Sequence, residues 1–138
     1  MRPSMVREAC RQSLADLKVD YVDLYLIHLP TSLIPEFPWP LRNQNIKWNE
    51  YYDDVDYLDT WKEMEALCHE GCCKAIGLSN FSQRQVERIM QHSSLPVAAI
   101  QVECNPYLTR SGLLDFCKAN KIAFVAHSPL GSPGDGHG

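Results

Sequence analysis

The sequence predicts an α/β fold, a partial (β/α)8 barrel that holds about half of the strands with their helices. Three observations carry this prediction. Segments with helical spacing of apolar residues alternate with short apolar runs typical of buried strands. The last three apolar runs begin at Lys74, Ala99 and Ile122, so they recur at short, regular intervals. Finally, the chain has 138 residues, whereas a complete eight-unit barrel takes about 250.

The first two elements are a helix and a strand. Residues Ser4–Leu17 place Val6, Ala9, Cys10, Leu14 and Leu17 at helical spacing, and Ser4 is the expected N-cap. Residues Val22–His28 are rich in apolar and β-branched side chains, which predicts a strand.

Three helices and three strands then alternate to the end of the predicted domain. By apolar spacing the helices are expected at Leu58–His69, which Gly71 would stop, at Ser82–His92 and at Thr109–Asn120. By their short, apolar composition the strands are expected at Lys74–Asn80, Ala99–Asn105 and Ile122–Ser128. Strands that alternate with helices favour parallel pairing through right-handed crossovers.

Two segments depart from this alternation. The connection Leu29–Tyr57 is long and carries four prolines and several aromatic residues. It is either a functional binding loop or a proline-stiffened loop packed by its own aromatics, and both interpretations stay open. The expected domain covers residues 1–132, and residues 133–138 are expected to form a flexible tail.

Composition and charge exclude several classes of function. The formal net charge is -4 with no run of Lys or Arg, which argues against nucleic-acid binding. No apolar stretch approaches the roughly 18 residues of a membrane span, and the polar start is unlike a signal peptide. We therefore expect a soluble, cytoplasmic protein, in which the six cysteines are free thiols. Cys68, His69, Cys72 and Cys73 resemble metal ligands, but they lack a second ligand pair, so buried thiols and no metal are expected.

Polar residues gather where the predicted strands end. Function in parallel α/β sheets collects at the carboxyl ends of the strands. His28 could tune a proton transfer or donate to a carbonyl, or it could be a hydrogen-bonded strand-end histidine. Ser79 and Asn80 follow small residues that leave room for a flat ligand, and their side chains suit an amide. Alternatively, Asn80 caps the next helix, in competition with Ser82.

The remaining strand ends extend this pattern. Gln101 could meet the same ligand from the next strand or be a satisfied core amide. His127 could present an aromatic face for stacking. The segment from Ser128 to Ser132 offers hydroxyls and loop amides that suit a phosphate, although such loops are common.

Four motifs give the chain a family resemblance. They are DYVDLYLIHLP from Asp20, KAIGLSNF from Lys74, IQVECNPYL from Ile100, and LLDFCKANKI followed by AHSPLGS. In this order and spacing the chain resembles the aldo-keto reductase superfamily, of the aldose and aldehyde reductase type, from about residue 2 to residue 132. The resemblance implies strands four to seven of a (β/α)8 barrel. It also implies NADPH-dependent reduction of aldehydes and ketones to alcohols, without metal or flavin.

The resemblance also implies roles for individual residues. His28 corresponds to the active-site histidine that orients the substrate carbonyl, and Leu29 stands where many members have a tryptophan lining the substrate pocket. The resemblance also implies which positions hold the cofactor. Ser79, Asn80 and Gln101 correspond to residues that bind the nicotinamide carboxamide, and His127 corresponds to the residue at the nicotinamide ring. Ser128, Leu130 and Ser132 match the loop that covers the pyrophosphate. The histidine at 127 replaces a tyrosine on which the ring usually stacks.

Other parts of the family's site have no match in these residues. The proton-donating tyrosine, its lysine partner and the aspartate lie upstream in the family, and the basic segment that selects the 2′-phosphate lies downstream. We therefore expect a partial reductase with weak or no turnover on its own, whose partners are a small aldehyde or ketone and neither nucleic acid nor membrane. Family members are usually monomeric, whereas this chain is expected to self-associate. The alternative is a non-catalytic interaction protein that assembles through exposed sheet edges.

Overall fold

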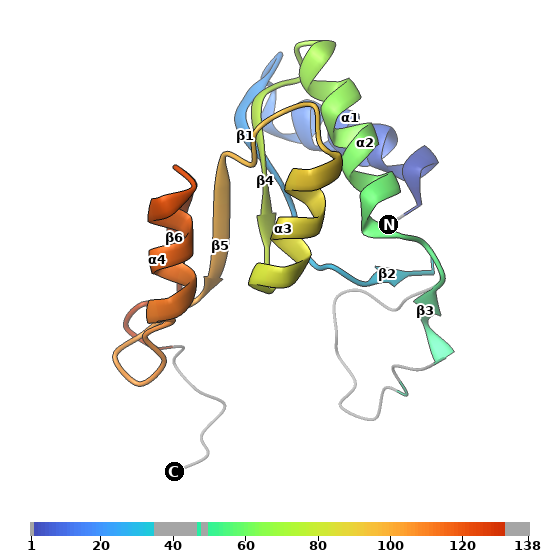
Figure 1. Cartoon of the computed structure of the whole chain (residues 1–138). Coiled ribbons are helices and arrows are strands. Elements are labelled where there is room, and N and C mark those ends of the chain that lie inside the picture. The colour runs from blue at the N-terminus through green and yellow to red at the C-terminus, as the bar shows by residue number, and fades with distance from the viewer. Residues whose placement is uncertain (1, 35–46, 48–49, 132–138) are drawn as a thin grey trace.

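The computed structural model describes residues 2–34, 47 and 50–131. The described chain forms a sheet of four parallel strands and a separate two-stranded pair, and Figure 1 shows how the helices lie against the main sheet. The elements run α1 (Pro3–Leu17), β1 (Val22–Ile27), β2 (Ser32–Leu33), β3 (Tyr52–Asp53), α2 (Tyr57–His69), β4 (Cys73–Ser79), α3 (Gln83–His92), β5 (Ala99–Glu103), α4 (Ser111–Ala119) and β6 (Ala123–His127). The predicted alternation of helices and strands is therefore confirmed, with element ends that differ by one or two residues in most cases.

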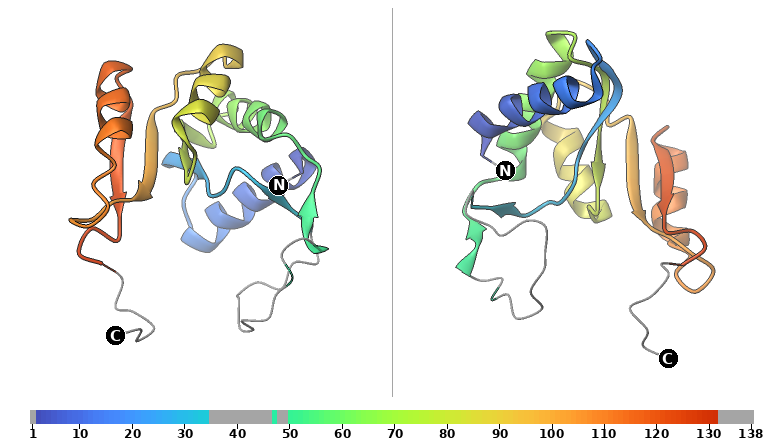
Figure 2. Two further views of the ribbon diagram at one scale, coloured as in Figure 1. Left: turned by 60° about the horizontal axis from the view of Figure 1, so that its bottom comes forward. Right: turned by 180° about the vertical axis from the view of Figure 1, so that it is seen from behind.

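The main sheet has the strand order β1-β4-β5-β6, and every neighbouring pair is parallel. Sequential strands that lie side by side and are linked by helices are the building plan of a (β/α) barrel. Within the described residues the sheet is open, with β1 and β6 at its edges (Figure 2). All four strands run in one direction, so their carboxyl ends share one edge of the sheet.

Several helix ends follow local sequence signals. Asp56 caps α2 by accepting a hydrogen bond from the Leu58 N–H at 3.0 Å. Gly71, with φ +83, ends that helix as predicted. Ser82 caps α3 through a capping box with Gln85. The prediction that Ser4 caps the first helix is wrong, because Pro3 occupies the first turn and the helix begins there.

One hydrophobic core joins the helices to one face of the sheet. Alternate residues of the central strands, such as Ile76 and Leu78 of β4, are at most 1% exposed and face this core. The helices supply the rest of the core through Val6, Cys10, Trp61, Met64, Leu67, Val86, Ile89 and Cys117. The other row of strand residues lies on the opposite face and is partly or wholly exposed at Leu24, Gln101, Glu103 and Val125. None of the described helices is long and apolar enough to cross a membrane.

The long connection contains a short antiparallel pair that the sequence analysis did not predict. Ser32 pairs with Asp53 and Leu33 pairs with Tyr52, which brings the two ends of the connection together. The Ile34 N–H extends this pairing by donating to the Tyr51 carbonyl at 2.9 Å. Most of the prolines of this connection, and the predicted tail at 133–138, lie outside the described residues.

Candidate active site at the carboxyl ends of the strands

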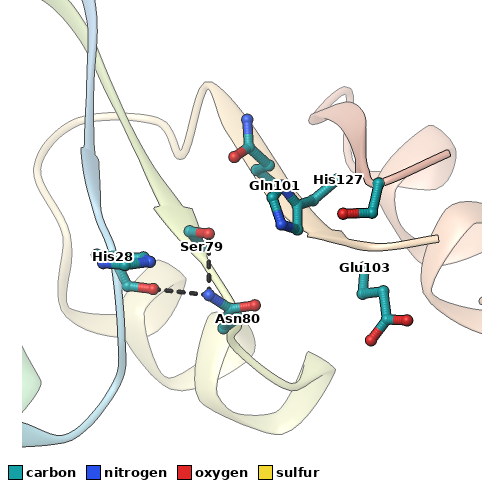
Figure 3. Close-up of a pocket in the computed structure, with 7 residues that line it drawn as sticks. His28, Ser79, Asn80, Gln101, Glu103 and His127 are labelled. Carbon is teal, nitrogen blue, oxygen red and sulfur yellow. Dashed lines mark hydrogen bonds between the residues drawn. The ribbon is translucent and has the colours of Figure 1, made fainter. Parts of the chain in front are cut away.

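A polar pocket of about 400 Å³ lies where the four parallel strands end. Figure 3 shows its side chains converging from β1, β4, β5 and β6. The pocket is lined by His28, Ser79, Asn80, Gln101, Glu103, His127 and Ser128. Six of these seven residues are site residues predicted from the sequence, so the fold brings together groups that lie up to a hundred positions apart in the chain.

Asn80 links the two sides of this pocket. Its Nδ2 donates to the main-chain carbonyl of His28 at 2.9 Å and to Ser79 Oγ at 3.2 Å (Figure 3). Its own N–H donates to the Gln101 carbonyl at 2.9 Å. Asn80 therefore connects the ends of β1, β4 and β5. Because Ser82 caps α3, the alternative role of Asn80 as a helix cap does not apply.

The backbone of Asn80 adopts a left-handed conformation with φ 63. Asparagine tolerates this region better than most residues with a Cβ atom. The turn lets the chain leave β4 and enter α3 while the Asn80 side chain stays at the pocket. The adjacent Ser79 is only 6% exposed and presents its hydroxyl to the same cavity.

Gly77 serves strand packing rather than the pocket. From the sequence alone, the small residues of this strand are expected to make room for a flat ligand. A Cβ atom at Gly77 would lie 2.5 Å from the carbonyl oxygen of Ala99 and 2.8 Å from Cδ2 of Leu26. Because Gly77 has no side chain, β5 and the Leu26 side chain can approach β4 closely at this position, two residues before Ser79.

His28 and Leu29 lie at the end of β1 but line different cavities. His28 is exposed, lines the polar pocket, and has its carbonyl held by Asn80. Leu29 lines a second, separate pocket of about 360 Å³ together with Thr31, Leu33 and Tyr52. The β2–β3 pair, which contributes Leu33 and Tyr52, therefore builds part of this more apolar pocket.

Glu103 is a pocket residue that the sequence analysis did not select. It lies two positions after Gln101 on β5, so both side chains point to the same face of the sheet. Its Oε1 accepts a hydrogen bond from Asn105 Nδ2 at 3.2 Å, and its carbonyl accepts one from Arg110 Nε at 3.1 Å. The sequence holds a signal for Glu103, because side chains two positions apart on a strand share one face and Gln101 is a predicted pocket residue.

β6 closes the pocket on its other side. Gln101 is in register with Val125, and Glu103 is in register with His127. The Cys104 N–H donates to the carbonyl of His127 at 3.1 Å, which continues the pairing beyond the strand. His127 therefore lies directly across from Glu103 at the mouth of the site.

A tight turn follows His127. The Gly131 N–H donates to the Ser128 carbonyl at 3.0 Å, and both residues have positive φ, 84 and 51. Ser128 lines the polar pocket, whereas the Leu130 side chain is 97% exposed and lies outside the pocket lining. Ser132, the last predicted cofactor residue, lies outside the described residues.

The cysteines Cys10, Cys68, Cys72 and Cys73 gather in and beside the core, at the end of the strands opposite the pocket. Cys10 and Cys73 are each 1% exposed. Burial, followed by the nearby thiols of Cys68 and Cys10, raises the pKa of the Cys73 thiol to about 12, so it stays protonated at neutral pH. Within the described residues, no group of three or more His, Cys, Asp or Glu side chains is placed to hold a metal ion.

The fold and site together define a partial (β/α) barrel with a polar pocket at its strand ends. The family model for the aldo/keto reductase family matches residues 1–134. The chain therefore belongs to the aldo/keto reductase family, as its motifs indicated.

Individual relatives agree with this assignment. The chain is 46% identical to estradiol 17 beta-dehydrogenase 5 of Mus musculus over 133 residues, which cover 95% of this chain and 41% of the relative. It is 45% identical to aldo-keto reductase family 1 member A1 of Gallus gallus, over 95% of this chain and 39% of the relative. The chain thus spans about two fifths of the length of these curated relatives.

A solved structure shares the fold. The aldo-keto reductase of Bombyx mori, crystallised in complex with NADP, superposes with a TM-score of 0.79 at 33% sequence identity. The match covers 92% of this chain and 37% of that chain. The partial-barrel prediction is confirmed by this similarity.

Proposed function

We propose that the chain carries the nicotinamide half of an NADPH site and takes part in reducing aldehydes or ketones to alcohols. The observation that carries this proposal is the gathering of Ser79, Asn80, Gln101 and His28 in one pocket at the strand ends. Family membership and the NADP complex of the Bombyx mori relative support it. Hydroxyl and carboxamide side chains match the donors and acceptors of the nicotinamide carboxamide.

The pocket residues other than Glu103 each have a distinct part in this proposal. Bound NADPH supplies the hydride. Ser79 and Gln101 would bind the carboxamide together with Asn80, whose bond to the His28 carbonyl holds these two residues together. His28 donates a hydrogen bond to the substrate carbonyl and orients it. His127 would contact the ring, and Ser128 would bind the pyrophosphate together with Leu130, which lies outside the pocket lining, and Ser132, which lies outside the described residues.

The apolar part of the carbonyl substrate is proposed to contact Leu29. This residue lines the second pocket with Leu33 and Tyr52, whose lining side chains are mainly apolar. His28 and Leu29 are adjacent, so one short segment serves the reacting carbonyl and the rest of the substrate.

We further propose that these 138 residues alone turn over carbonyl substrates slowly. Among the described residues, neither a tyrosine hydroxyl nor a lysine ammonium lines the polar pocket. Without a positioned general acid, rates typically fall about 10²–10⁴-fold. An assay with NADPH and 4-nitrobenzaldehyde tests this part, and turnover at the rate of a complete reductase contradicts it.

Cofactor binding is the direct test of the site. Calorimetric titration with NADPH is expected to show saturable binding that Gln101→Ala weakens by about fivefold, because a hydrogen bond to the ligand contributes about 1 kcal/mol. Gln91→Ala, an exposed glutamine on α3, is the matched control and should bind like the parent chain. Equal affinity of Gln101→Ala and the parent chain rejects the proposed site.

The compartment proposed for this protein is the cytoplasm. All six cysteines are free in the structure. Unpaired thiols in this number are typical of reducing compartments.

A second candidate function is assembly through the sheet edges. The open edges at β1 and β6 favour it, because edge strands present unpaired main-chain groups to other chains. Concentration-dependent assembly without NADPH binding would favour this function over reduction.

A further inference from the structure

Three cysteines meet at the junction between α2 and β4, which lies at the end of the strands opposite the polar pocket. Cys68 belongs to the last turn of α2, whereas Cys72 and Cys73 follow the turn at Gly71, and Cys73 is the first residue of β4. The same strand reaches the pocket only at its other end, with Ser79. What these thiols do is therefore independent of the proposed reduction of carbonyls.

Main-chain hydrogen bonds fix the geometry of this junction. The Gly71 N–H donates to the Cys68 carbonyl at 3.1 Å, which closes the turn at the end of the helix. The Val22 N–H of β1 donates to the Cys72 carbonyl at 3.1 Å, and Val22 is also in register with Cys73. The last turn of α2 and the start of β4 are therefore held in one arrangement relative to each other.

The Cys68 thiol reaches across the junction to the first residues of β4. Its Sγ donates to the Lys74 carbonyl at 3.5 Å, and Lys74 directly follows Cys73 in the strand. The Cys73 thiol lies beside it, because the two thiols share a side-chain hydrogen bond. After burial, Cys68 is the neighbour that raises the pKa of the Cys73 thiol most. The helix and the strand thus place two thiols in contact with each other.

The two thiols differ in what can reach them. Cys68 is half-buried, so a small solute has access to it, whereas Cys73 is 1% exposed and packs in the hydrophobic core. A thiol reacts as its thiolate, and a pKa of about 12 leaves Cys73 almost entirely protonated at neutral pH. Cys68 is therefore the thiol that meets an oxidant from solution, and Cys73 is a shielded thiol that can react only with a neighbour.

We propose that Cys68 and Cys73 are a modification site for hydroperoxides, which convert the two thiols into a reversible disulfide. The Cys68 sulfur attacks one peroxide oxygen, the O–O bond breaks, and a sulfenic acid and water result. The Cys73 sulfur then attacks the Cys68 sulfur, and the S–O bond breaks as the S–S bond forms. The hydroxyl leaves with the Cys73 proton as a second water. The two thiols together lose the two electrons that reduce one hydrogen peroxide, and a thiol reductant reverses the change.

The experiment treats the folded, reduced chain with hydrogen peroxide and locates the oxidised thiols. Free thiols are first blocked with iodoacetamide in urea, the disulfide is then reduced, and the released thiols are labelled with N-ethylmaleimide before mass spectrometry. We expect the chain to lose two of its six free thiols, with the second label on Cys68 and Cys73. Dithiothreitol added after the peroxide should restore all six.

Two variants separate the roles of the thiols. Cys68→Ser should leave the remaining thiols reduced, whereas Cys73→Ala should stop the reaction at the sulfenic acid of Cys68, which dimedone traps. Cys104→Ser is the matched control, and it should form the same disulfide as the parent. The Cys104 thiol is also half-buried and donates to a main-chain carbonyl, that of Thr109, at 3.5 Å, but residues 104–110 contain no second cysteine.

Three results would overturn the inference. The first is a folded chain that keeps its six thiols or that collects a sulfenic acid on Cys68 with no disulfide. The second is a disulfide that forms elsewhere, such as between Cys10 and Cys72, or that joins two chains. The third is a chain unfolded in urea that links Cys68 to Cys73 as fast as the folded chain does, because nearness in sequence would then be sufficient. We expect unfolding to slow this linkage.

Discussion

At the scale of single residues, Asn80 combines a backbone requirement with a binding role. Its left-handed φ of 63 and its bonds to His28 and Ser79 can be separated by substitution. Asn80→Gly keeps the backbone conformation and removes the amide, whereas Asn80→Ala also strains the backbone. We expect both variants to lose NADPH affinity, and Asn80→Ala to be less stable than Asn80→Gly by about 1 kcal/mol. Urea unfolding and calorimetry measure the two effects, and equal stability of the variants would contradict the backbone argument.

Gly77 gives a second prediction at this scale. A methyl group there meets the Ala99 carbonyl oxygen at 2.5 Å, and backbone cannot move aside as a flexible side chain can. Gly77→Ala should therefore destabilise the fold by about 1–3 kcal/mol. The control is Gly112→Ala in α4, where the added Cβ meets nothing within 4 Å. That change should be neutral or stabilising by up to about 1 kcal/mol, since alanine favours helix. Similar losses in both variants would argue against the packing explanation.

Sequence patterns located most of the pocket but missed Glu103. Polar residues that end apolar strands, such as His28 and Asn80, stand out because a strand buried on both faces should be apolar. The role of Gly77 did not emerge, because strand register decides whether a small residue faces a ligand or a neighbouring carbonyl. Likewise, Leu29 and His28 are adjacent in sequence, and only the local chain direction places them in different cavities.

At the scale of elements, a buried carboxylate joins α2 to the segment after α3. Glu65 is 8% exposed, and its Oε1 accepts bonds from Ser93 Oγ at 2.7 Å, from the Ser94 N–H at 2.6 Å and from the Leu95 N–H at 3.0 Å. Trp61 Nε1 also donates to Ser93 Oγ at 2.7 Å. Burial raises the pKa of Glu65, but these hydrogen bonds outweigh it and leave the pKa below its ordinary value of 4.5.

The sign of the resulting pH dependence follows from this lowered pKa. The charged carboxylate stabilises the folded chain above pH 4.5, and this contribution is lost as pH falls through the folded-state pKa. Glu65→Gln should cost about 1.5–3 kcal/mol at pH 7 and flatten the loss of stability in acid. Urea unfolding between pH 3 and 7 measures this, with Glu8→Gln on the exposed side of α1 as the control. An acid dependence equal to that of the parent chain would rule out Glu65 as its source.

Long periodic elements were predictable, and very short ones were not. Seven or more residues of helical or strand pattern, as in β4 and α2, leave a readable signal. The strands β2 and β3 have only two residues each, which is too short to show a periodic pattern. Their pairing joins residues about twenty positions apart, which a local pattern does not reveal. The start of α1 was misplaced because Ser4 matched a capping preference, while Pro3 set the helix start through its fixed φ.

At the scale of the whole molecule, the open sheet predicts self-association of these 138 residues. Leu24 on the edge strand β1 is 38% exposed on the face away from the helices. Leu24→Lys should lower the tendency to associate, because a charge on an edge strand opposes pairing with another chain. Leu17→Lys is the matched control, since Leu17 is 62% exposed at the end of α1. Sedimentation at several concentrations tests this, and a chain that stays monomeric throughout would refute the prediction.

The β2–β3 pair has a consequence for how this protein can diverge. Because Ser32 is held against Asp53, the two ends of the connection between β1 and α2 lie side by side. Its length can then change without altering the spacing of β1 and α2, and doubling such a loop costs only about 0.6 kcal/mol in closure entropy. We therefore expect insertions between Ile34 and Tyr51 to cost little folding free energy. Natural selection can then lengthen, shorten or exchange this part of the sequence while the barrel strands stay as they are.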